Sequence, residues 1–317
     1  MKTIKVVCVL LILTFCTCVG LYISGRQGAF ETNNWTENLT FQDADVIEFV
    51  SKSDNVKVMQ ITDLHLSFIY SALNTKTFNF IGKALDTENP DLLVVTGDLT
   101  IGLDNKNMLK KFAEFMESRE QYWLYTLGNH DYEFGVGAYN LLSVLDGCQY
   151  CLFDVGYTNI GYGNNFVVLK NNMGQALYTL TLLDTSAYTV TKEQTNWYKW
   201  GMAGLRQKYG VNNFIFTHIP LPILSSLDLD VEERISPLKG DGGLWQAITD
   251  IGVSNYYAFG HDHLNNYSVN LNGVEFINCR STGFSGYGRK DLARELIIYD
   301  FHYNSIDISR KNYYHYD

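Results

Sequence analysis

Five short motifs rich in histidine and aspartate constrain the fold of this chain most strongly, because each directly follows a strongly apolar run. In chain order they are Asp63-Leu64-His65, Gly97-Asp98, Gly128-Asn129-His130-Asp131, Thr217-His218 and Gly260-His261-Asp262-His263. Each apolar run is typical of a buried strand, so each motif falls at the carboxyl end of a strand or in the loop after it. Open α/β sheets place their binding sites at that edge. The sequence therefore predicts one site built from five strand ends.

The side chains in these motifs are metal ligands by chemistry. Imidazole is a common ligand, and carboxylate and amide oxygens suit hard or borderline divalent and trivalent ions. Asp63 and His65 are two residues apart, so on an extended strand end both point to one side and can hold one ion. The two oxygens of Asp98 can bridge two ions. The seven candidate ligands, a number that matches two-metal hydrolases, are Asp63, His65, Asp98, Asn129, His218, His261 and His263.

From residue 56 onward the sequence alternates between strand-like and helical patterns. The strand-like runs are 56–61, 92–96, 122–127, 166–169, 177–183, 213–217 and 256–259. The helical patterns are 75–88, 107–119, 138–145, 192–208 and 243–251. A strand meander follows at 269–271, 274–278, 292–301 and 305–309, with a hairpin turn at Asn272-Gly273. Alternation followed by a meander predicts two packed sheets flanked by helices in a single catalytic domain, residues 55–317.

The amino-terminal 54 residues have a different character. Residues 1–24 combine a short basic start with an apolar stretch, which fits either a cleaved signal peptide or an uncleaved membrane anchor. Residues 25–54 are interpreted as a polar lead-in with little core potential. We therefore expect the catalytic domain to be secreted or lumenal, with a membrane tether if the anchor is retained. Glycosylation sequons that agree with this location begin at Asn34, Asn38 and Asn266.

The net charge and the cysteine content further limit the class of protein to which this chain can belong. The formal net charge of −10 argues against a nucleic-acid-binding surface, for which a basic patch is expected. Outside the targeting segment the cysteines are Cys148, Cys151 and Cys279, which permit one disulfide and one free thiol. Cys148 and Cys151 have the spacing of a zinc half-site, but the chain offers no second pair. A local or long-range disulfide in an oxidising compartment is the favoured interpretation.

The motif series D-x-H, G-D, G-N-H-D, H and G-H-x-H resembles that of the calcineurin-like metallophosphoesterase family. The resemblance covers nearly everything from residue 56 to the carboxyl terminus. The segments 218–222 (HIPLP), 260–265 (GHDHLN) and 283–288 (GFSGYG) look like the small purple-acid-phosphatase-like branch of that family. The family resemblance implies an α/β fold, a four-layer αββα sandwich of two mixed sheets.

The resemblance also implies roles for the candidate residues. One metal ion would be held by Asp63, His65, Asp98 and His263. The other would be held by Asp98, Asn129, His218 and His261. The ions would be divalent or trivalent, of iron, zinc or manganese. His130 would not be a ligand; it would contact phosphate and protonate the leaving alcohol.

Two departures from related subgroups matter. Purple acid phosphatases have D-x-G and a metal-bound tyrosine, whereas this chain has His65 in the first motif and Ile101 where that tyrosine would stand. We therefore expect no purple iron–tyrosinate centre. The segment after Asp98 also lacks the arginine of the calcineurin subfamily proper, so close membership of that subfamily is not expected.

Several residues near the motifs have secondary interpretations. Asp131 and Asp262 are expected to support the ligands or to orient an imidazole. Tyr287 and Arg289 lie on a glycine-rich loop, where they could contact phosphate or could be ordinary surface residues. Asp184, after the strand 177–183, is interpreted as a strand-end capping residue.

The ligand series predicts metal-dependent hydrolysis of a phosphoester by water, with no phosphoenzyme. A phosphomonoester substrate, including a phosphoprotein, is favoured by the purple-acid-phosphatase-like segments. A phosphodiester, such as a cyclic nucleotide or a sphingomyelin-type head group, is the alternative. A third hypothesis is a non-catalytic binding scaffold on the same fold, which would predict missing ligands.

Overall fold

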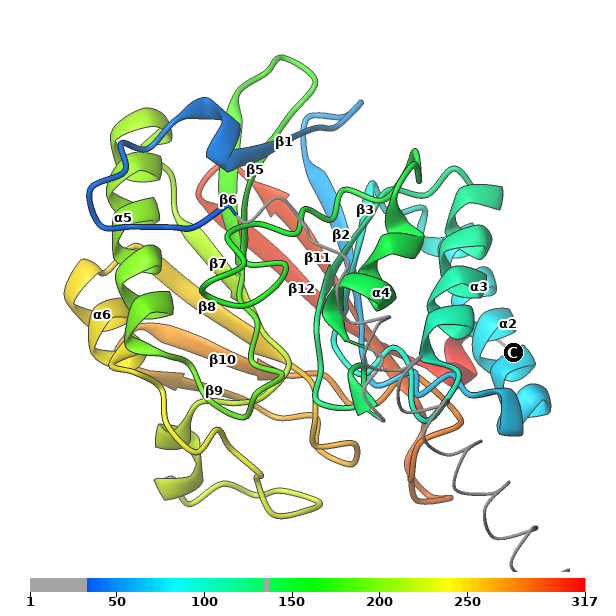
Figure 1. Ribbon diagram of the computed structural model, residues 1–317. Coiled ribbons are helices and arrows are strands. Elements are labelled where there is room, and N and C mark those ends of the chain that lie inside the picture. The colour runs from blue at the N-terminus through cyan, green and yellow to red at the C-terminus, as the bar shows by residue number, and fades with distance from the viewer. Residues whose placement is uncertain (1–32, 134–136, 317) are drawn as a thin grey trace, which may run out of the picture.

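The computed structural model describes residues 33–133 and 137–316. Two mixed β-sheets pack face to face, and helices cover the outer face of each sheet (Figure 1). The expected four-layer αββα sandwich is therefore confirmed. The predicted signal peptide or anchor at residues 1–24 lies outside the described residues.

The first sheet has five strands. The central strand and the two strands on one side of it each lead into one of the first three motifs. Its strands, in order across the sheet, are β12 (Ser305–Asn312), β11 (Glu295–His302), β2 (Val56–Ile61), β3 (Leu92–Thr96) and β4 (Trp123–Thr126). Strands β2, β3 and β4 are parallel, and β11 joins them antiparallel through β2. Its helices are α2 (Ser71–Glu88), α3 (Asn105–Ser118) and α4 (Ala138–Leu142). Parallel β2, β3 and β4 bring their carboxyl ends to one edge.

The second sheet has seven strands. Their order is β1 (Val46–Val50), β5 (Asn165–Lys170), β6 (Ala176–Leu182), β7 (Asn213–Phe216), β8 (Ser254–Phe259), β10 (Val274–Asn278) and β9 (Ser268–Leu271). Its helices are α5 (Lys192–Tyr209) and α6 (Leu244–Ile251). The short 3-10 helices are η1 (Asp43–Asp45), η2 (Phe68–Tyr70), η4 (Ser143–Leu145), η5 (Pro222–Ser226) and η6 (Tyr313–Tyr316). Strands β6, β7 and β8 are parallel, so they too end at a common edge.

Successive side chains of the central strands pack into the cores on opposite sides of each sheet, which produces the layers. Val58 of β2 packs into the core between the sheets, and its neighbour Met59 packs into the core beneath α2 and α3. Successive side chains of a strand point to opposite faces, so a strand buried on both faces is apolar along most of its length. The second sheet repeats this pattern, with Val167 between the sheets and Val168 beneath α5.

Helix α5 shows how local sequence sets the limits of an element. The Thr191 side chain accepts a hydrogen bond from Gln194 N, and the Gln194 side chain accepts one from Thr191 N. This capping box satisfies two amide groups at the start of the helix. The helix ends at Gly210, whose φ of 65° favours glycine.

Two parts of the fold differ from the sequence-based prediction. The segment 25–54 is not merely a polar lead-in, because β1 pairs in parallel with β5 and buries Val46 and Phe49. Trp35 is also buried, in the core beneath α5. The carboxyl-terminal strands are two hairpins in different sheets rather than one meander. The chain crosses between them through the loop 279–294.

The predicted disulfide is wrong for the described cysteines, all of which are free thiols. Cys279 is buried in the core between the sheets, whereas Cys148 and Cys151 pack on the helical side of the five-stranded sheet. The sheet itself therefore separates Cys279 from the other two.

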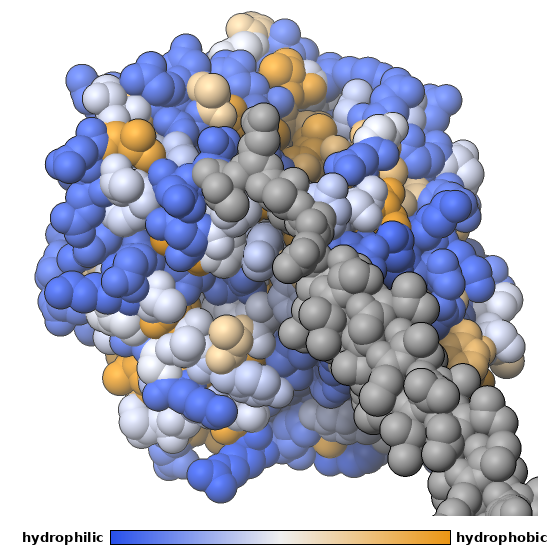
Figure 2. Space-filling view, viewed as in Figure 1, coloured by the Kyte–Doolittle hydropathy of each residue, from blue (hydrophilic) through white to orange (hydrophobic). Residues whose placement is uncertain are grey.

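Within the described ranges, no helix combines the length and apolar character needed to cross a bilayer. Figure 2 shows that the face seen in Figure 1 is mainly hydrophilic, with hydrophobic residues scattered over it in small groups.

Candidate metal centre

The predicted ligands come from both sheets and meet where the parallel strands end. Asp63 and His65 follow β2, Asp98 follows β3, and Asn129 follows β4. His218 follows β7, and the motif of His261 and His263 follows β8. The face-to-face packing of the sheets is what allows both sets of strand ends to contribute to one site.

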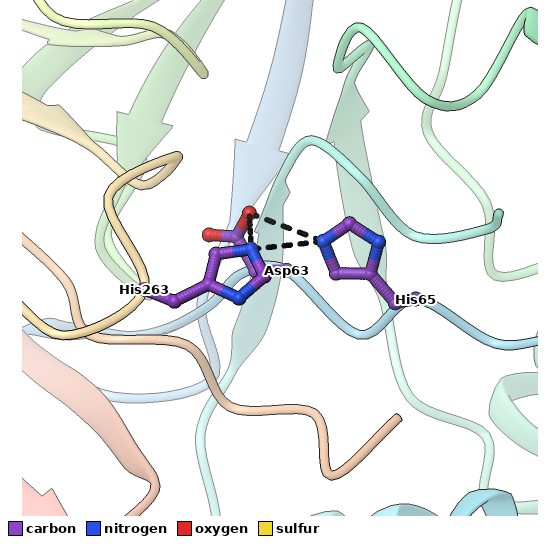
Figure 3. Close-up of side chains that lie close together, drawn as sticks. All are labelled: Asp63, His65 and His263. Carbon is purple, nitrogen blue, oxygen red and sulfur yellow. Dashed lines mark hydrogen bonds and ion pairs between the residues drawn. The ribbon is translucent and has the colours of Figure 1, made fainter. Parts of the chain in front are cut away.

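One group of ligands consists of Asp63, His65 and His263, whose candidate ligand atoms all lie within 4.8 Å of one another (Figure 3). The Nε2 atoms of His65 and His263 are 3.0 Å apart. His263 Nε2 lies 3.3 Å from Asp63 Oδ1, and His65 Nε2 lies 3.7 Å from the same oxygen. All three side chains are buried. The three atoms converge on one point, as ligands of a single ion do.

A second group consists of Asp98, His218 and His261, again within 4.8 Å of one another. His218 Nε2 lies 3.2 Å from Asp98 Oδ2 and 3.3 Å from His261 Nδ1. The other ring nitrogen of His218, Nδ1, lies 2.8 Å from the carbonyl oxygen of Thr96. A contact of this kind from the second ring nitrogen fixes which nitrogen is free to bind a metal.

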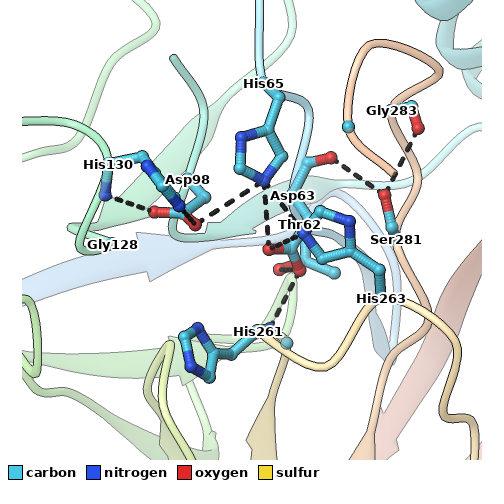
Figure 4. A network of polar contacts seen from close by, with 12 residues as sticks. Thr62, Asp63, His65, Asp98, Gly128, His130, His261, His263, Ser281 and Gly283 are labelled. Atoms are coloured by element: carbon cyan, nitrogen blue, oxygen red, sulfur yellow. Dashed lines mark hydrogen bonds and ion pairs between the residues drawn. The ribbon is translucent and has the colours of Figure 1, made fainter. Parts of the chain in front are cut away.

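Asp98 belongs to the second group and also faces His65 of the first, beside which it lies in Figure 4. Its Oδ2 is 3.2 Å from His218 Nε2 and 3.6 Å from His65 Nε2, so one oxygen faces ligands of both groups. Its Oδ1 accepts a hydrogen bond from His130 N. This position is the one that a bridging carboxylate requires.

The residues present fit a pair of metal ions. Two groups of nitrogen and oxygen ligands share a carboxylate, and the side-chain oxygen of Asn129 is buried without a hydrogen-bond partner in the described chain. An unpaired buried amide oxygen costs free energy unless a ligand satisfies it. The family-based assignment of Asp63, His65 and His263 to one ion and His218 and His261 to the other agrees with the two groups.

The backbone at the ligands adopts conformations that L-residues rarely use. Four of the predicted ligands have positive φ angles: Asp63 (52°), His65 (47°), Asp98 (48°) and His261 (72°). Such conformations cost free energy and concentrate at functional sites, where the surrounding structure maintains them. Their clustering at this edge is independent evidence that the loops are shaped for a ligand.

Gly97 and Gly128, which each precede a candidate ligand, must be glycine because neighbouring side chains approach them closely. Gly97 has a φ of 81°, and a Cβ atom there would lie 2.4 Å from His218 Cγ. A Cβ atom on Gly128 would lie 2.2 Å from Asp98 Oδ1. Both distances are below any van der Waals contact, so the G-D and G-N pairs of the motifs leave space for ligands from neighbouring strands.

Electrostatics hold the site in a charged state. Burial opposes ionisation of Asp98, but the charges of His218 and His65 outweigh it and lower the pKa of Asp98. Burial likewise opposes protonation of His218, yet Asp98 and Asp63 raise the pKa of His218 to about 10. Burial and the charge of His218 lower the pKa of His261 to about 4. The proton on His218 therefore competes with a metal ion for this ring, and metal binding would displace it.

His130 lies beside this centre but belongs to neither group. Its Nε2 is 4.0 Å from Asp98 Oδ2, and its ring lies edge-on to that of His65 at a centroid distance of 5.1 Å. Its Nδ1 lies 2.5 Å from Glu133 Oε1, and Glu133 Oε2 accepts a hydrogen bond from Gly102 N. Glu133 was not identified from the sequence. The signal that could have revealed it is a carboxylate three residues after the histidine, within the turn that follows β4.

The two aspartates expected to support the ligands act on loops instead of imidazoles. Asp131 accepts hydrogen bonds from Gly128 N at 2.8 Å and Thr100 N at 2.9 Å, which ties together the loops after β3 and β4. Burial and the charge of Asp98 raise the pKa of Asp131 to about 6. Asp262 accepts from Ser236 N, and burial raises its pKa to about 7. Neither carboxylate contacts a histidine in the described chain, so the predicted orienting role is wrong for both.

The structure separates the remaining candidates. The Tyr287 ring stacks on His263 at 3.9 Å, and the Tyr287 carbonyl lies 3.0 Å from His263 Nδ1, so this residue fixes a ligand. Arg289 instead pairs with Glu232 and Asp291. Asp184 accepts hydrogen bonds from Tyr162 N and Ser186 N beyond the end of β6, which confirms its capping role.

Comparison of the sequence with known proteins identifies relatives along most of the chain. A family model described as calcineurin-like phosphoesterase matches residues 56–265, more than half of the chain. Probable inactive purple acid phosphatase 14 of Arabidopsis thaliana is 26% identical over 299 residues, covering 76% of this chain and 74% of that protein. Phosphatase DCR2 of Saccharomyces cerevisiae is 26% identical over 259 residues, covering 67% of this chain but only 45% of that protein.

Solved structures share the fold. A dimetal phosphatase from Danio rerio superposes with a TM-score of 0.60 at 12% identity, covering 81% of this chain and 96% of that one. Purple acid phosphatase PPD1 from yellow lupin superposes with a TM-score of 0.52 at 14% identity, covering 84% of this chain and 53% of that one. At these identities the similarity establishes the architecture alone.

Proposed function

This chain belongs to the calcineurin-like phosphoesterase family, and we propose that it is a phosphomonoesterase that uses two metal ions and water. The observation that carries the proposal is the pair of ligand groups that meet at Asp98, with His130 beside them. Family membership implies a phosphoester substrate. A monoester, either a small acid-phosphatase substrate or a phosphoprotein, is the specific proposal.

When bound, a pair of metal ions at such a site lowers the pKa of water and stabilises negative charge on phosphoryl oxygens. The chain itself supplies the positioning. Asp98 faces both ligand groups, which keeps them close together. His130 directs Nε2 toward the ligand set while its Nδ1–H donates to Glu133. The protonated ring therefore carries its second proton on Nε2 and can give that proton to the leaving oxygen.

A second candidate is a binding protein without catalysis. The names of relatives favour it, since three matched Arabidopsis thaliana proteins are called probable inactive purple acid phosphatases. Against it stands the completeness of the site here, because loss of catalysis on this fold predicts missing ligands. All seven predicted ligands and His130 are present in this chain. The absence of a tyrosine at Ile101 removes a purple chromophore but no ligand of the assigned set.

We also propose that the catalytic domain is secreted or faces a lumen. The charge and apolarity of residues 1–24 support this, as does the exposure of Asn34, Asn38 and Asn266 at the three sequons. Treatment of the protein from its native source with an endoglycosidase should increase its electrophoretic mobility. Unchanged mobility, together with an intact segment 1–24 facing the cytosol, would contradict the location.

The activity is tested with purified protein reconstituted separately with iron, zinc and manganese, using p-nitrophenyl phosphate and bis-p-nitrophenyl phosphate. We expect metal-dependent release of phosphate from the monoester, and loss of that activity in Asp98→Asn. Faster turnover of the diester would replace the monoesterase proposal with the diesterase alternative. Two bound ions per chain with hydrolysis of neither ester would favour the binding protein.

A further inference from the structure

A second charged feature lies on the outer side of the loop 279–294. A pocket of about 370 Å³ opens between α2, this loop and the carboxyl-terminal helix η6, which packs beside α2 (Figure 1). We call it the basic pocket. Its charged and aromatic lining residues are Lys76, Arg289, Lys290, Arg294, Phe284, Tyr313 and Tyr314. No carboxylate of the described residues lines it, although the chain has a net charge of −10.

Two of these cations share one aromatic ring. Lys76 Nζ lies 4.1 Å from the centroid of the Phe284 ring, and the Arg294 guanidinium carbon lies 5.8 Å from the same centroid. Lys76 also lies over the Tyr313 ring at 4.6 Å. An aromatic face attracts a cation but carries no net charge. The two positive charges are therefore held near each other without being neutralised.

Carboxylates do not neutralise these cations within the described part of the chain. Among the described residues, no carboxylate oxygen lies within 4.0 Å of the charged nitrogen atoms of Lys76, Lys290 or Arg294. In contrast, Arg119 and Arg310 each pair with a carboxylate at 2.7 Å. The charge of the pocket therefore comes from Lys76, Lys290 and Arg294, because Arg289 already pairs with Glu232 and Asp291.

The burial of Arg294 makes the positive charge of the pocket energetically unfavourable. Its guanidinium donates to the carbonyl oxygens of Tyr287 at 3.0 Å and Gly286 at 2.9 Å, and burial lowers its pKa. Carbonyls satisfy some of its donors but do not balance its charge. The charge of Asp63 favours the charged form of Arg294, but only from beyond contact distance. A partly buried cation with no carboxylate in contact is unfavourable, and the like charge of Lys76 over the same ring adds to the cost. An anion in the pocket would offset part of both penalties.

We propose that the basic pocket binds a phosphate-type oxyanion. Arginine and lysine are the side chains that recognise such anions, through charge-assisted hydrogen bonds. The pocket is distinct from the metal centre but shares a loop with it. On the inner side of this loop, a Cβ atom on Gly286 would lie 2.7 Å from His263 Cε1, and Tyr287 stacks on the same ligand. Arg294 holds the carbonyl oxygens of both residues from the pocket side.

The anion could come from two sources with the same chemistry. It could be free inorganic phosphate, or it could be a second phosphate group on a substrate whose first phosphate is at the metal centre. The second source rests on the proposed hydrolytic function, whereas the first does not. The experiment therefore needs one arm that measures binding and one that measures turnover.

The first arm counts inorganic phosphate bound per molecule of metal-loaded protein by equilibrium dialysis. If the pocket binds the free anion, the wild type should bind one phosphate at the metal centre and one in the pocket. Lys76→Met should weaken the pocket site by about tenfold or more, the loss expected for one charge-assisted hydrogen bond. Asp98→Asn should remove only the phosphate at the metal centre.

Lys110→Met is the matched control, because Lys110 is an exposed lysine of α3 whose one carboxylate partner among the described residues is Glu114. It removes the same charge from the chain and should leave phosphate binding unchanged. Lys290→Met is a second variant within the pocket and should act in the same direction as Lys76→Met.

The second arm compares KM for alkyl monophosphates with KM for α,ω-bisphosphates of three to eight carbons. If the second phosphate of a substrate fills the pocket, one bisphosphate should have a KM about tenfold lower than its monophosphate, and Lys76→Met should abolish the difference. Pocket binding in the first arm identifies a free anion, and a KM effect in the second identifies the substrate. The proposal is overturned if neither arm responds to Lys76→Met, or if Lys110→Met has the same effect.

Discussion

Glu133 offers the sharpest test of how this site would protonate a leaving group. In the structure, its carboxylate contacts His130 Nδ1 at 2.5 Å, and Gly102 N anchors the other oxygen at 3.2 Å. The contact holds the ring in one orientation, with Nδ1–H directed to Glu133 and Nε2 facing Asp98, so the protonated ring carries its transferable proton on Nε2. Glu133 is thus a positioning residue, since only His130 would reach the substrate. The perturbation is Glu133→Ala.

The expected loss of turnover in Glu133→Ala follows from how far His130 and Glu133 are exposed to solvent. A hydrogen bond to a charged group contributes about 1.5–3 kcal/mol when it is protected from water. The side chains of His130 and Glu133 are 34% and 30% exposed, so solvent reduces this to about 1–1.5 kcal/mol. At 1.36 kcal/mol for each factor of ten, turnover of an ester that needs protonation should fall about tenfold. His130→Ala, which removes the proton donor itself, should cost about 10²–10⁴.

The assay compares two monoesters that differ in their need for a proton. An alkyl phosphate releases a strongly basic alkoxide, whereas p-nitrophenyl phosphate releases a stable anion. Glu133→Ala should therefore slow the alkyl ester about tenfold and the aryl ester less than threefold, with metal content unchanged. Glu114→Ala is the control and should affect neither ester. Glu114 is an exposed carboxylate that, within residues 33–133 and 137–316, pairs with Lys110 alone. Equal losses on both esters would show a merely structural role, and no loss on the alkyl ester would refute the positioning argument.

The remaining predictions concern metal binding. Because Ile101 replaces the tyrosine of purple enzymes, iron-loaded protein should lack an intense visible charge-transfer band, and a purple sample with stoichiometric iron would contradict this. Burial lowers the pKa of His218, but Asp98 and Asp63 outweigh burial and raise this pKa to about 10. His218 is therefore protonated at pH 7, and metal loading at that pH should release a proton from it. Metal affinity should then rise about tenfold per pH unit below pH 10, and calorimetry in buffers of different ionisation enthalpy measures the released proton; a result independent of buffer would rule it out. Gly97→Ala should reduce metal occupancy, because the added Cβ atom would lie 2.4 Å from His218 Cγ; normal occupancy by elemental analysis would show that this approach is not needed.

That the candidate ligands lie close together could be predicted because each of them is tied to a strand end. The run before Asp63 is mostly apolar on both faces, which indicates that β2 is a buried strand. Two parallel neighbours bring Asp98 and Asn129 to the same edge. The packing of two sheets then brings in the histidines after β7 and β8. These steps depend on strand periodicity and chain order, which the sequence contains.

Other features depend on tertiary contacts that have no local pattern. Strand β1 is short and lies at a sheet edge, where only Val46 and Phe49 are buried, so its apolar signal is weak. The contact of Glu133 with His130 depends on the conformation of a single turn. The thiol of Cys279 is separated from the other two by a sheet, which cysteine spacing cannot reveal.

Asp131 and Asp262 show the same limit at the site. Their position beside ligands in the sequence suggested contact with an imidazole. In the structure they accept backbone hydrogen bonds instead, from Gly128 and Ser236 among others. Adjacency in sequence places a side chain near a site but does not determine which group it contacts.

We propose that Asp98 would hold both metal ions at the junction of the sheets, and metal analysis of two variants after gel filtration tests this role most directly. Wild type should retain two ions per chain and release phosphate from a monoester. Asp98→Asn removes the charge that faces both ligand groups, so both ions should be lost together, whereas His65→Ala should mainly empty one position. Retention of two ions by Asp98→Asn with near-normal affinity would contradict the bridging role and the ligand assignment built on it.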